Sequence, residues 1–177
     1  MSEKQYVWDP LVRLFHWSLV ALIAAQIFVI DEESDLHVTL GYVIAALIAF
    51  RLLWGFVGTR HARFSDFPPN PQAAMGQLSD MASGRHKEYR GHNPLGALMI
   101  YNLLASIALI ALTGYMMGTP RYFGIEWVEE VHEMLVVWLQ VSIVVHITAV
   151  ILESRRSRVN LPKAMVTGYK VPVTGRD

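Results

Sequence analysis

The sequence predicts an all-α integral membrane protein, a four-helix bundle with both termini in the cytoplasm. Hydrophobic residues make up 53% of its 177 positions and charged residues only 17%, which is too apolar for an ordinary soluble domain. Several apolar segments also approach the length of about 20 residues that is needed to cross the hydrocarbon core of a bilayer. A chain of this length has room for one compact unit, so residues 1–177 are expected to form a single domain.

Four segments are expected to be membrane-spanning helices, at about 12–30, 36–57, 95–117 and 129–152. The loop over 58–94 contains no repeat or low-complexity tract. Within it, Asn70 followed by Pro71 favours the start of a short helix that runs through Met75 and Met81. We expect this helix to lie along the membrane surface.

Basic residues set the expected orientation. The short links 31–35 and 118–128 contain only Arg121, whereas the N-terminal arm, the long loop and the C-terminal tail are basic. Their basic residues are Lys4, Arg60, Arg63, Arg85, Lys87, Arg90, Arg155, Arg156, Arg158, Lys163, Lys170 and Arg176. Because Lys and Arg accumulate in cytoplasmic loops, both termini are predicted to face the cytoplasm.

The opposite side is predicted to be acidic. Its carboxylates are Asp31, Glu32, Glu33, Asp35, Glu126, Glu129, Glu130 and Glu133. One interpretation is a docking surface for a basic soluble partner, and the other is simple solvation of two helix ends. A formal net charge of zero argues against nucleic acid as a partner. The absence of cysteine excludes thiolate-ligated iron–sulfur clusters and covalently attached c-type haem.

Histidines at two depths are the main candidates for a functional site. His132 and His146 lie fourteen residues apart in the last apolar segment, which separates them by about 21 Å in depth and only about 40° around the helix. With the N-terminus inside, His16 lies near the inner end of the first helix and His37 near the outer start of the second. His37 can therefore meet His132 on the outer side, and His16 can meet His146 on the inner side.

Two opposed neutral imidazoles can fill both axial positions of a haem iron, and a four-helix bundle is a common setting for such a site. The alternative for His16 or His37 taken singly is an interfacial, hydrogen-bonded residue. A zinc site would need about four ligands around one point, which pairs about 21 Å apart do not provide. His61, His86 and His92 belong to the inner loop, where we expect solvent, headgroup or cap contacts.

Two arginines are weaker candidates. Arg51 lies fourteen residues after His37 on the same helical face, at the inner end, where a haem propionate would need a cationic partner. Arg13 has the same position relative to the membrane. Snorkelling to the headgroups explains both residues nearly as well.

Several runs of the sequence resemble the bacterial cytochrome b561 family, which includes the b-type cytochrome subunits of nickel–iron hydrogenases. They are VWDPLVRLFHW, LHVTLGYVIAALIAFRLLWGFVG, GHNPLGALM, VHEMLVVWLQVSIVVH and NLPKAMVTGYK. Together they extend over nearly the whole chain. The resemblance implies a bacterial inner-membrane, multi-pass protein with two non-covalent, bis-histidine b haems. It also implies that His16 and His146 hold the cytoplasmic haem, and that His37 and His132 hold the periplasmic one.

The same resemblance implies electron transfer between the membrane quinone pool and a partner such as a periplasmic c-type cytochrome. A self-contained superoxide:quinone oxidoreductase is the alternative. A hydrogenase partner is less favoured, because cytochromes of that type are often longer and have a fifth helix, which this chain lacks. The sequence does not decide whether the chain is an enzyme by itself or an electron-transfer component.

Overall fold

The computed structural model describes residues 5–85, 89 and 91–171. Five residues named above lie outside this part of the chain: Lys4, His86, Lys87, Arg90 and Arg176. The all-α prediction is confirmed, because four long apolar helices dominate the described residues. They are α1 (Pro10–Phe28), α2 (Asp35–Val57), α4 (Pro94–Met117) and α5 (Glu126–Ser157), and each is long and apolar enough to cross a membrane.

Local sequence signals start these helices. The side chains of Asp9, Ser34 and Asn93 cap the N-termini of α1, α2 and α4, each accepting a hydrogen bond from a backbone N–H in the first turn. Proline occupies the first turn of α1 and α4, where the missing N–H costs nothing. The last helix extends to Ser157, five residues past its expected end near 152, and includes a basic final turn. Arg158 ends the helix in the left-handed conformation.

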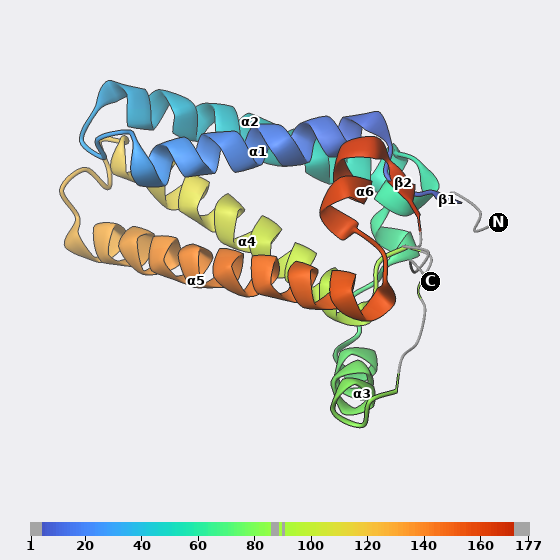
Figure 1. The fold of residues 1–177 in the computed structure, drawn as a ribbon. Helices are drawn as coiled ribbons and strands as arrows, with labels where there is room; N and C mark the ends of the chain where they lie inside the picture. The colour runs from blue at the N-terminus through green and yellow to red at the C-terminus, as the bar shows by residue number, and fades with distance from the viewer. Residues whose placement is uncertain (1–4, 86–88, 90, 172–177) are drawn as a thin grey trace.

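The four long helices form two layers. Helices α1 and α2 lie beside each other above α4 and α5 (Figure 1), and the closest packing joins α4 to α5, α2 to α4 and α1 to α2. The core between them is narrow and apolar. Its buried members are Phe15, Ile44, Ile48, Leu104, Ile107 and Leu139. Large side chains such as Phe28, Leu53 and Val144 face outward, which is the pattern of a surface solvated by lipid.

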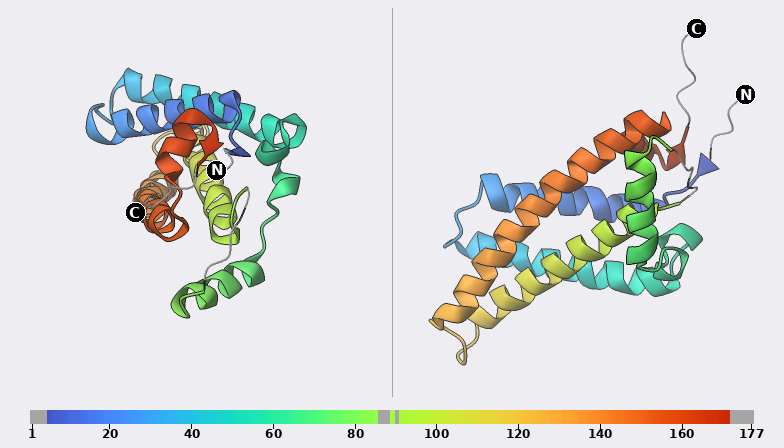
Figure 2. Two further views of the ribbon diagram at one scale, coloured as in Figure 1. Left: turned by 45° about the vertical axis from the view of Figure 1, so that its right-hand side comes forward. Right: turned by 90° about the horizontal axis from the view of Figure 1, so that it is seen from below.

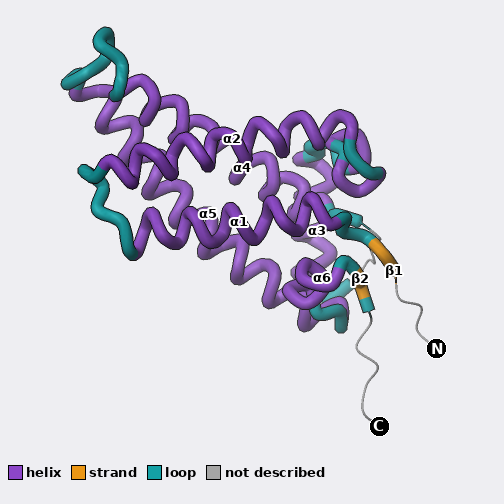
Figure 3. The backbone as a smooth tube through the Cα atoms, turned by 90° about the horizontal axis from the view of Figure 1, so that it is seen from above, coloured by secondary structure: helices purple, strands orange, loops and turns teal. Residues whose placement is uncertain are grey.

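All the short elements gather at one end of the bundle (Figures 2 and 3). The 3₁₀ turns η1 (Arg60–Ala62) and η2 (Phe64–Asp66) follow α2, and α6 (Leu161–Thr167) follows α5. Strands β1 (Gln5–Tyr6) and β2 (Tyr169–Lys170) pair antiparallel, which ties the start of the described chain to its end. The two short links 31–35 and 118–128 both lie at the opposite end (Figure 3).

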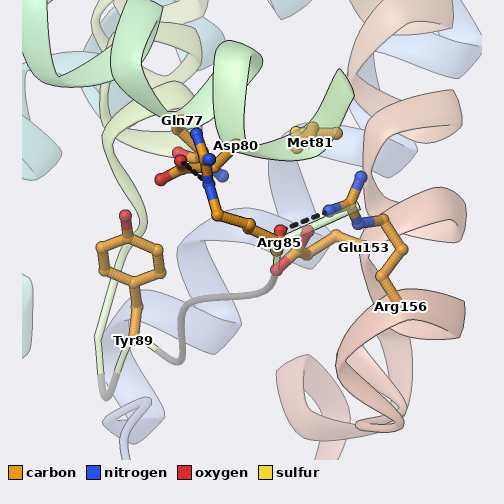
Figure 4. Close-up of a pocket in the computed structure, with 7 residues that line it drawn as sticks. All are labelled: Gln77, Asp80, Met81, Arg85, Tyr89, Glu153 and Arg156. Atoms are coloured by element: carbon orange, nitrogen blue, oxygen red, sulfur yellow. Dashed lines mark hydrogen bonds and ion pairs between the residues drawn. The ribbon is translucent and has the colours of Figure 1, made fainter. Parts of the chain in front are cut away.

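The helix expected after Asn70 is confirmed as α3 (Pro71–Ala82), with Asn70 as its N-cap. It packs against α4, and the segment that follows it reaches the C-terminal part of α5, where Arg156 donates to the Arg85 carbonyl and Arg85 pairs with Asp80 (Figure 4). The pocket between them measures about 10 Å³, which is space for about one water molecule. This contact therefore supports the position of α3 and offers no room for a substrate.

A polar network crosses the middle of the α4–α5 interface. The Asn102 amide donates to the Ser142 hydroxyl at 2.9 Å and accepts from the Trp138 indole N–H at 3.0 Å. Ser142 is buried, so its hydroxyl has little access to water. Because polar groups in hydrocarbon need partners, these bonds favour one register of α4 against α5.

Asp9 joins the start of α1 to the end of α2. This buried carboxylate accepts from the Val12 N–H, the Trp54 indole and the Thr59 hydroxyl. Burial by itself raises the pKa of Asp9, but the hydrogen bonds, the largest of them from Thr59, outweigh it and lower the pKa below its usual 3.8. The ionised form is therefore the one that the fold stabilises.

Replacing Asn102 with leucine is expected to weaken the α4–α5 interface, since Trp138 and Ser142 then lose their partner. Each hydrogen bond between membrane helices is worth about 0.6 kcal/mol on average, so the loss should be about 1–2 kcal/mol. Unfolding in mixed detergent micelles measures it. Leu112→Ala, at a residue on the outer surface of α4, serves as the control. Equal stability of Asn102→Leu and the wild type would contradict this role.

The Asp9 bonds predict a pH-dependent stability. A carboxyl whose pKa is lowered by folding stabilises the protein fully above its unfolded value of about 3.8, and the contribution disappears as the pH falls through the lower folded value. Asp9→Asn keeps the cap and removes the charge, so it should destabilise the protein by about 1 kcal/mol at pH 7. Thermal unfolding of both proteins should converge below about pH 3. A constant difference across this range would contradict the assignment.

Candidate functional site

The four histidines that the sequence singled out come from three helices. His16 lies in α1, His37 in the first turn of α2, and His132 and His146 in α5. All four side chains are partly buried. They face the bundle while neighbours such as Val145 and Ile147 point outward. The helical period accounts for this difference between the histidines and their neighbours, because one face of each helix packs inward.

The bundle places these imidazoles in two groups. His16 lies within electrostatic range of His146, and His37 lies within electrostatic range of His132. Each pair joins the α1–α2 layer to α5, at two different depths. The role of these pairs as haem ligands stays a prediction. Among the described residues, no cluster of three or more His, Asp or Glu side chains forms a metal-ion site.

Ring nitrogens at two of these positions have no protein partner. The Nδ1 atoms of His16 and His37 are buried and make no hydrogen bond. Gly41 lies one turn after His37, and a Cβ atom there would meet nothing within 4 Å, so the bundle is open beside it. An imidazole without a hydrogen-bond partner, next to open space, is compatible with a flat group held between histidines.

His132 differs in having a hydrogen bond to its ring. Its Nδ1 lies 2.9 Å from the hydroxyl of Thr113, a buried residue of α4. Sequence reasoning missed Thr113, because it precedes His132 by nineteen positions and belongs to another helix. A lone threonine within an apolar helix is the only signal that the sequence offers.

Arg51 is a buried cation in the C-terminal part of α2, with 4% of its surface exposed. Its guanidinium lies 5.0 Å from the Phe64 ring and within electrostatic range of Asp9 and Tyr101. One nitrogen, Nη1, is buried without a hydrogen-bond partner. A buried charge with a free donor suits an anionic group, and this is what the propionate hypothesis requires.

Arg13 has a contact that the sequence did not suggest. Its guanidinium donates to the carbonyl of Val166 in α6, and the neighbouring Trp17 indole donates to the carbonyl of Met165. The Nε atom of Arg13 is buried without a partner. Arg13 therefore joins α1 to the C-terminal segment, and its haem contact stays a prediction.

The inner loop histidines have different surroundings from those expected. The ring of His92 lies between Trp8 and Phe67, with centroids 4.7 and 4.2 Å away. Burial, followed by the nearby Lys170 and Arg51 cations, lowers the pKa of His92 to about 3. His92 is therefore a neutral packing residue at physiological pH. His61 instead pairs with Asp66 at 2.8 Å.

Lys170 of β2 binds the loop that precedes α4. Its ammonium donates to the backbone carbonyls of Tyr89 and Gly91, at 3.3 and 2.7 Å. A cavity of about 290 Å³ lies beside this loop, and its lining includes Arg60, the His61–Asp66 pair and His92. The C-terminal strand thus holds the entry to α4 in place.

The acidic residues of the two short links are all exposed and lie at the end of the bundle opposite β1 and β2 (Figure 1). They come from the α1–α2 link and the first two turns of α5. The tertiary structure therefore brings together two acidic segments that are nearly one hundred residues apart in the sequence.

Membrane-length helices with opposed imidazoles are the features of a membrane b-type cytochrome, a protein that passes electrons through haem. The chain belongs to the prokaryotic cytochrome b561 family, whose family model matches residues 7–168. It is thus a multi-pass membrane electron-transfer protein of a prokaryotic family, and the family implies b-type haem. The resemblance found in the sequence is confirmed.

Three curated relatives are each named probable Ni/Fe-hydrogenase B-type cytochrome subunit. The one from Cupriavidus necator is 29% identical over 216 aligned positions, covering 95% of this chain and 87% of the relative. Those from Azotobacter vinelandii and Bradyrhizobium diazoefficiens are 28% and 27% identical, covering 94% and 93% of this chain and 88% and 85% of the relatives. No solved structure matches the chain significantly.

Proposed function

We propose that the protein carries electrons across the bacterial inner membrane, between the quinone pool and a periplasmic carrier such as a c-type cytochrome. Two non-covalent b haems would be held by His16 with His146 and by His37 with His132. The single observation that supports this most is the pairing of the four imidazoles at two depths of one bundle. A relay across a membrane needs a redox centre near each side.

Each haem, when bound, supplies an iron that gains and loses one electron. The protein's part is to bind and orient it. Neutral imidazoles would hold the iron through a ring nitrogen, and the apolar core around Phe15 and Leu139 would exclude water. The buried Arg51 guanidinium, with its unpaired Nη1, offsets a propionate charge on the inner side. Arg13 is a second candidate for the same task.

The orientation follows from the charges at the two ends. Arg60, Arg63 and Lys163 lie at the end that carries β1 and β2, while acidic side chains occupy the other end. The positive-inside rule puts the first end in the cytoplasm. His16 and His146 then serve the cytoplasmic side, and the acidic end faces the periplasm.

An acidic periplasmic face favours a basic protein partner. Its carboxylates attract a cationic c-type cytochrome and raise the rate of encounter. The same charges repel superoxide, which is an anion, so the superoxide:quinone oxidoreductase is the less favoured alternative.

Hydrogenase is a second candidate partner, favoured by the names of the relatives. The alignment with the Cupriavidus necator relative spans 216 positions, which exceeds the 177 residues of this chain. That relative therefore contains segments that this chain lacks. A periplasmic carrier, which needs no such segments, remains the preferred partner.

Substitution of the α5 histidines tests the haem assignment. Purified protein should contain about two non-covalent b haems per chain, and His146→Leu and His132→Leu should each reduce this to about one, because a bis-histidine site loses half its axial bonds. Redox titration should show that the two variants retain different haems. His61→Gln, outside the proposed ligand set, should keep both. Two haems in each α5 variant would disprove the pairing.

Electron transfer tests the proposed partners. A short-chain quinol should reduce the haems, and a basic c-type cytochrome should then oxidise them at a rate that falls at least tenfold from low to high salt. Replacing Glu129, Glu130 and Glu133 together with glutamine should slow oxidation at low salt, whereas Glu153→Gln at the other end of α5 should not. Rapid turnover with superoxide alone would support the alternative enzyme.

A further inference from the structure

The ring of His132 is held from α4 by two consecutive residues. The hydroxyl of Thr113 lies 2.9 Å from its Nδ1. A Cβ atom on the adjacent Gly114 would lie only 3.3 Å from Cε1 of the same ring, so the absence of a side chain there lets the imidazole lie against α4. Thr113 is buried, with 6% of its surface exposed.

The hydrogen bonds of Thr113 decide where the ring proton lies. A hydroxyl has one proton to donate and can also accept. The Thr113 oxygen lies 3.0 Å from the carbonyl oxygens of both Leu109 and Ile110, and these atoms can only accept. The hydroxyl proton can point to a carbonyl, and the Ile110 carbonyl is itself a hydrogen-bond partner of the His132 ring. Since a carbonyl can only accept, both contacts favour a proton on Nδ1 of His132, with the Thr113 oxygen as an acceptor. This tautomer leaves the lone pair on Nε2.

His16 and His37 lack this support. The Nδ1 atoms of His16 and His37 are buried without a partner. A ligand histidine whose second nitrogen donates a hydrogen bond is fixed in orientation and is a stronger electron donor to its metal. The two predicted haem sites are therefore unequal in this structure.

We propose that Thr113 is a positioning residue for the periplasmic-side haem. Its hydroxyl fixes the tautomer and the ring plane of His132, so that Nε2 is available to the iron. It also increases the basicity of that ligand, which stabilises the oxidised iron and lowers the potential of this haem relative to an unsupported site. This inference rests on the proposed role of His132 as a ligand.

The decisive variant is Thr113→Val, which keeps the shape of the side chain and removes the hydroxyl. In protein purified with its haems, the midpoint potential of one haem should rise while that of the other is unchanged. Retention of the same haem against a haem-binding competitor should fall by about 10–100-fold. The low-spin ferric resonance of that haem should also shift, since its ligand plane is no longer fixed. Thr113→Ser should restore all three values.

A matched control lies on the same helix. Ser106 is buried two turns before Thr113 and donates to the carbonyl of Asn102, and no hydrogen bond joins it to a histidine of the described residues. Ser106→Ala should leave both potentials at their wild-type values. Gly114→Ala provides a second perturbation of the ring that keeps the hydroxyl, and it should alter the resonance of the same haem as Thr113→Val.

The outcomes separate the two levels of the hypothesis. Wild-type protein with a single haem, or a second haem retained in His132→Leu, would overturn the ligand assignment and the role of Thr113 with it. Two haems in the wild type with unchanged potentials, resonances and haem retention in Thr113→Val would overturn the role of Thr113 alone. Equal shifts of both haems would also overturn it, since the effect would then be a general change in structure.

Discussion

Polar groups that leave water for a hydrocarbon layer must find partners, and this requirement governs the whole structure. It makes the four spans helical, because only an α-helix satisfies its own backbone. It also selects the few side-chain contacts within the bundle. Asn102 satisfies Ser142 and Trp138, and Thr113 satisfies its own helix and His132. His16, His37 and Arg51 are among the residues whose buried polar atoms lack a hydrogen-bond partner, and these atoms are suited to hold another group.

Helices α4 and α5 contribute to the candidate haem sites in different ways. The α5 helix contains two of the predicted ligands, fourteen residues apart, while α4 contains no histidine. Yet α4 makes the closest packing with α5, and its Asn102 and Thr113 contact α5 at two depths. A helix without ligands can therefore determine where ligands point. The end that carries β1 and β2 is fixed differently, through the backbone contacts of Arg13 and Lys170 and the carboxylate of Asp9.

The asymmetry of the two ends supports the proposed orientation of the protein in the membrane. The acidic residues gather where the chain makes its two shortest connections, and the remaining loops, strands and α6 form a basic cap at the other end. A soluble partner can approach the acidic end with few obstacles. At the cap, the neutral His92 lies between aromatic rings and Lys170 closes the loop before α4, so this end is the more rigidly connected one.

The sequence by itself determined the four spans, α3 and the place of each histidine along its helix, because hydropathy and helical period are local properties of a chain. It also predicted which histidines approach each other, since the orientation of antiparallel helices puts their residues at known depths. Tertiary structure alone decided that Thr113 supports His132, that Arg13 binds Val166 and that His92 is packed between Trp8 and Phe67. These contacts join segments far apart in the chain. They depend on how the helices are rotated and packed against each other, which no local pattern specifies.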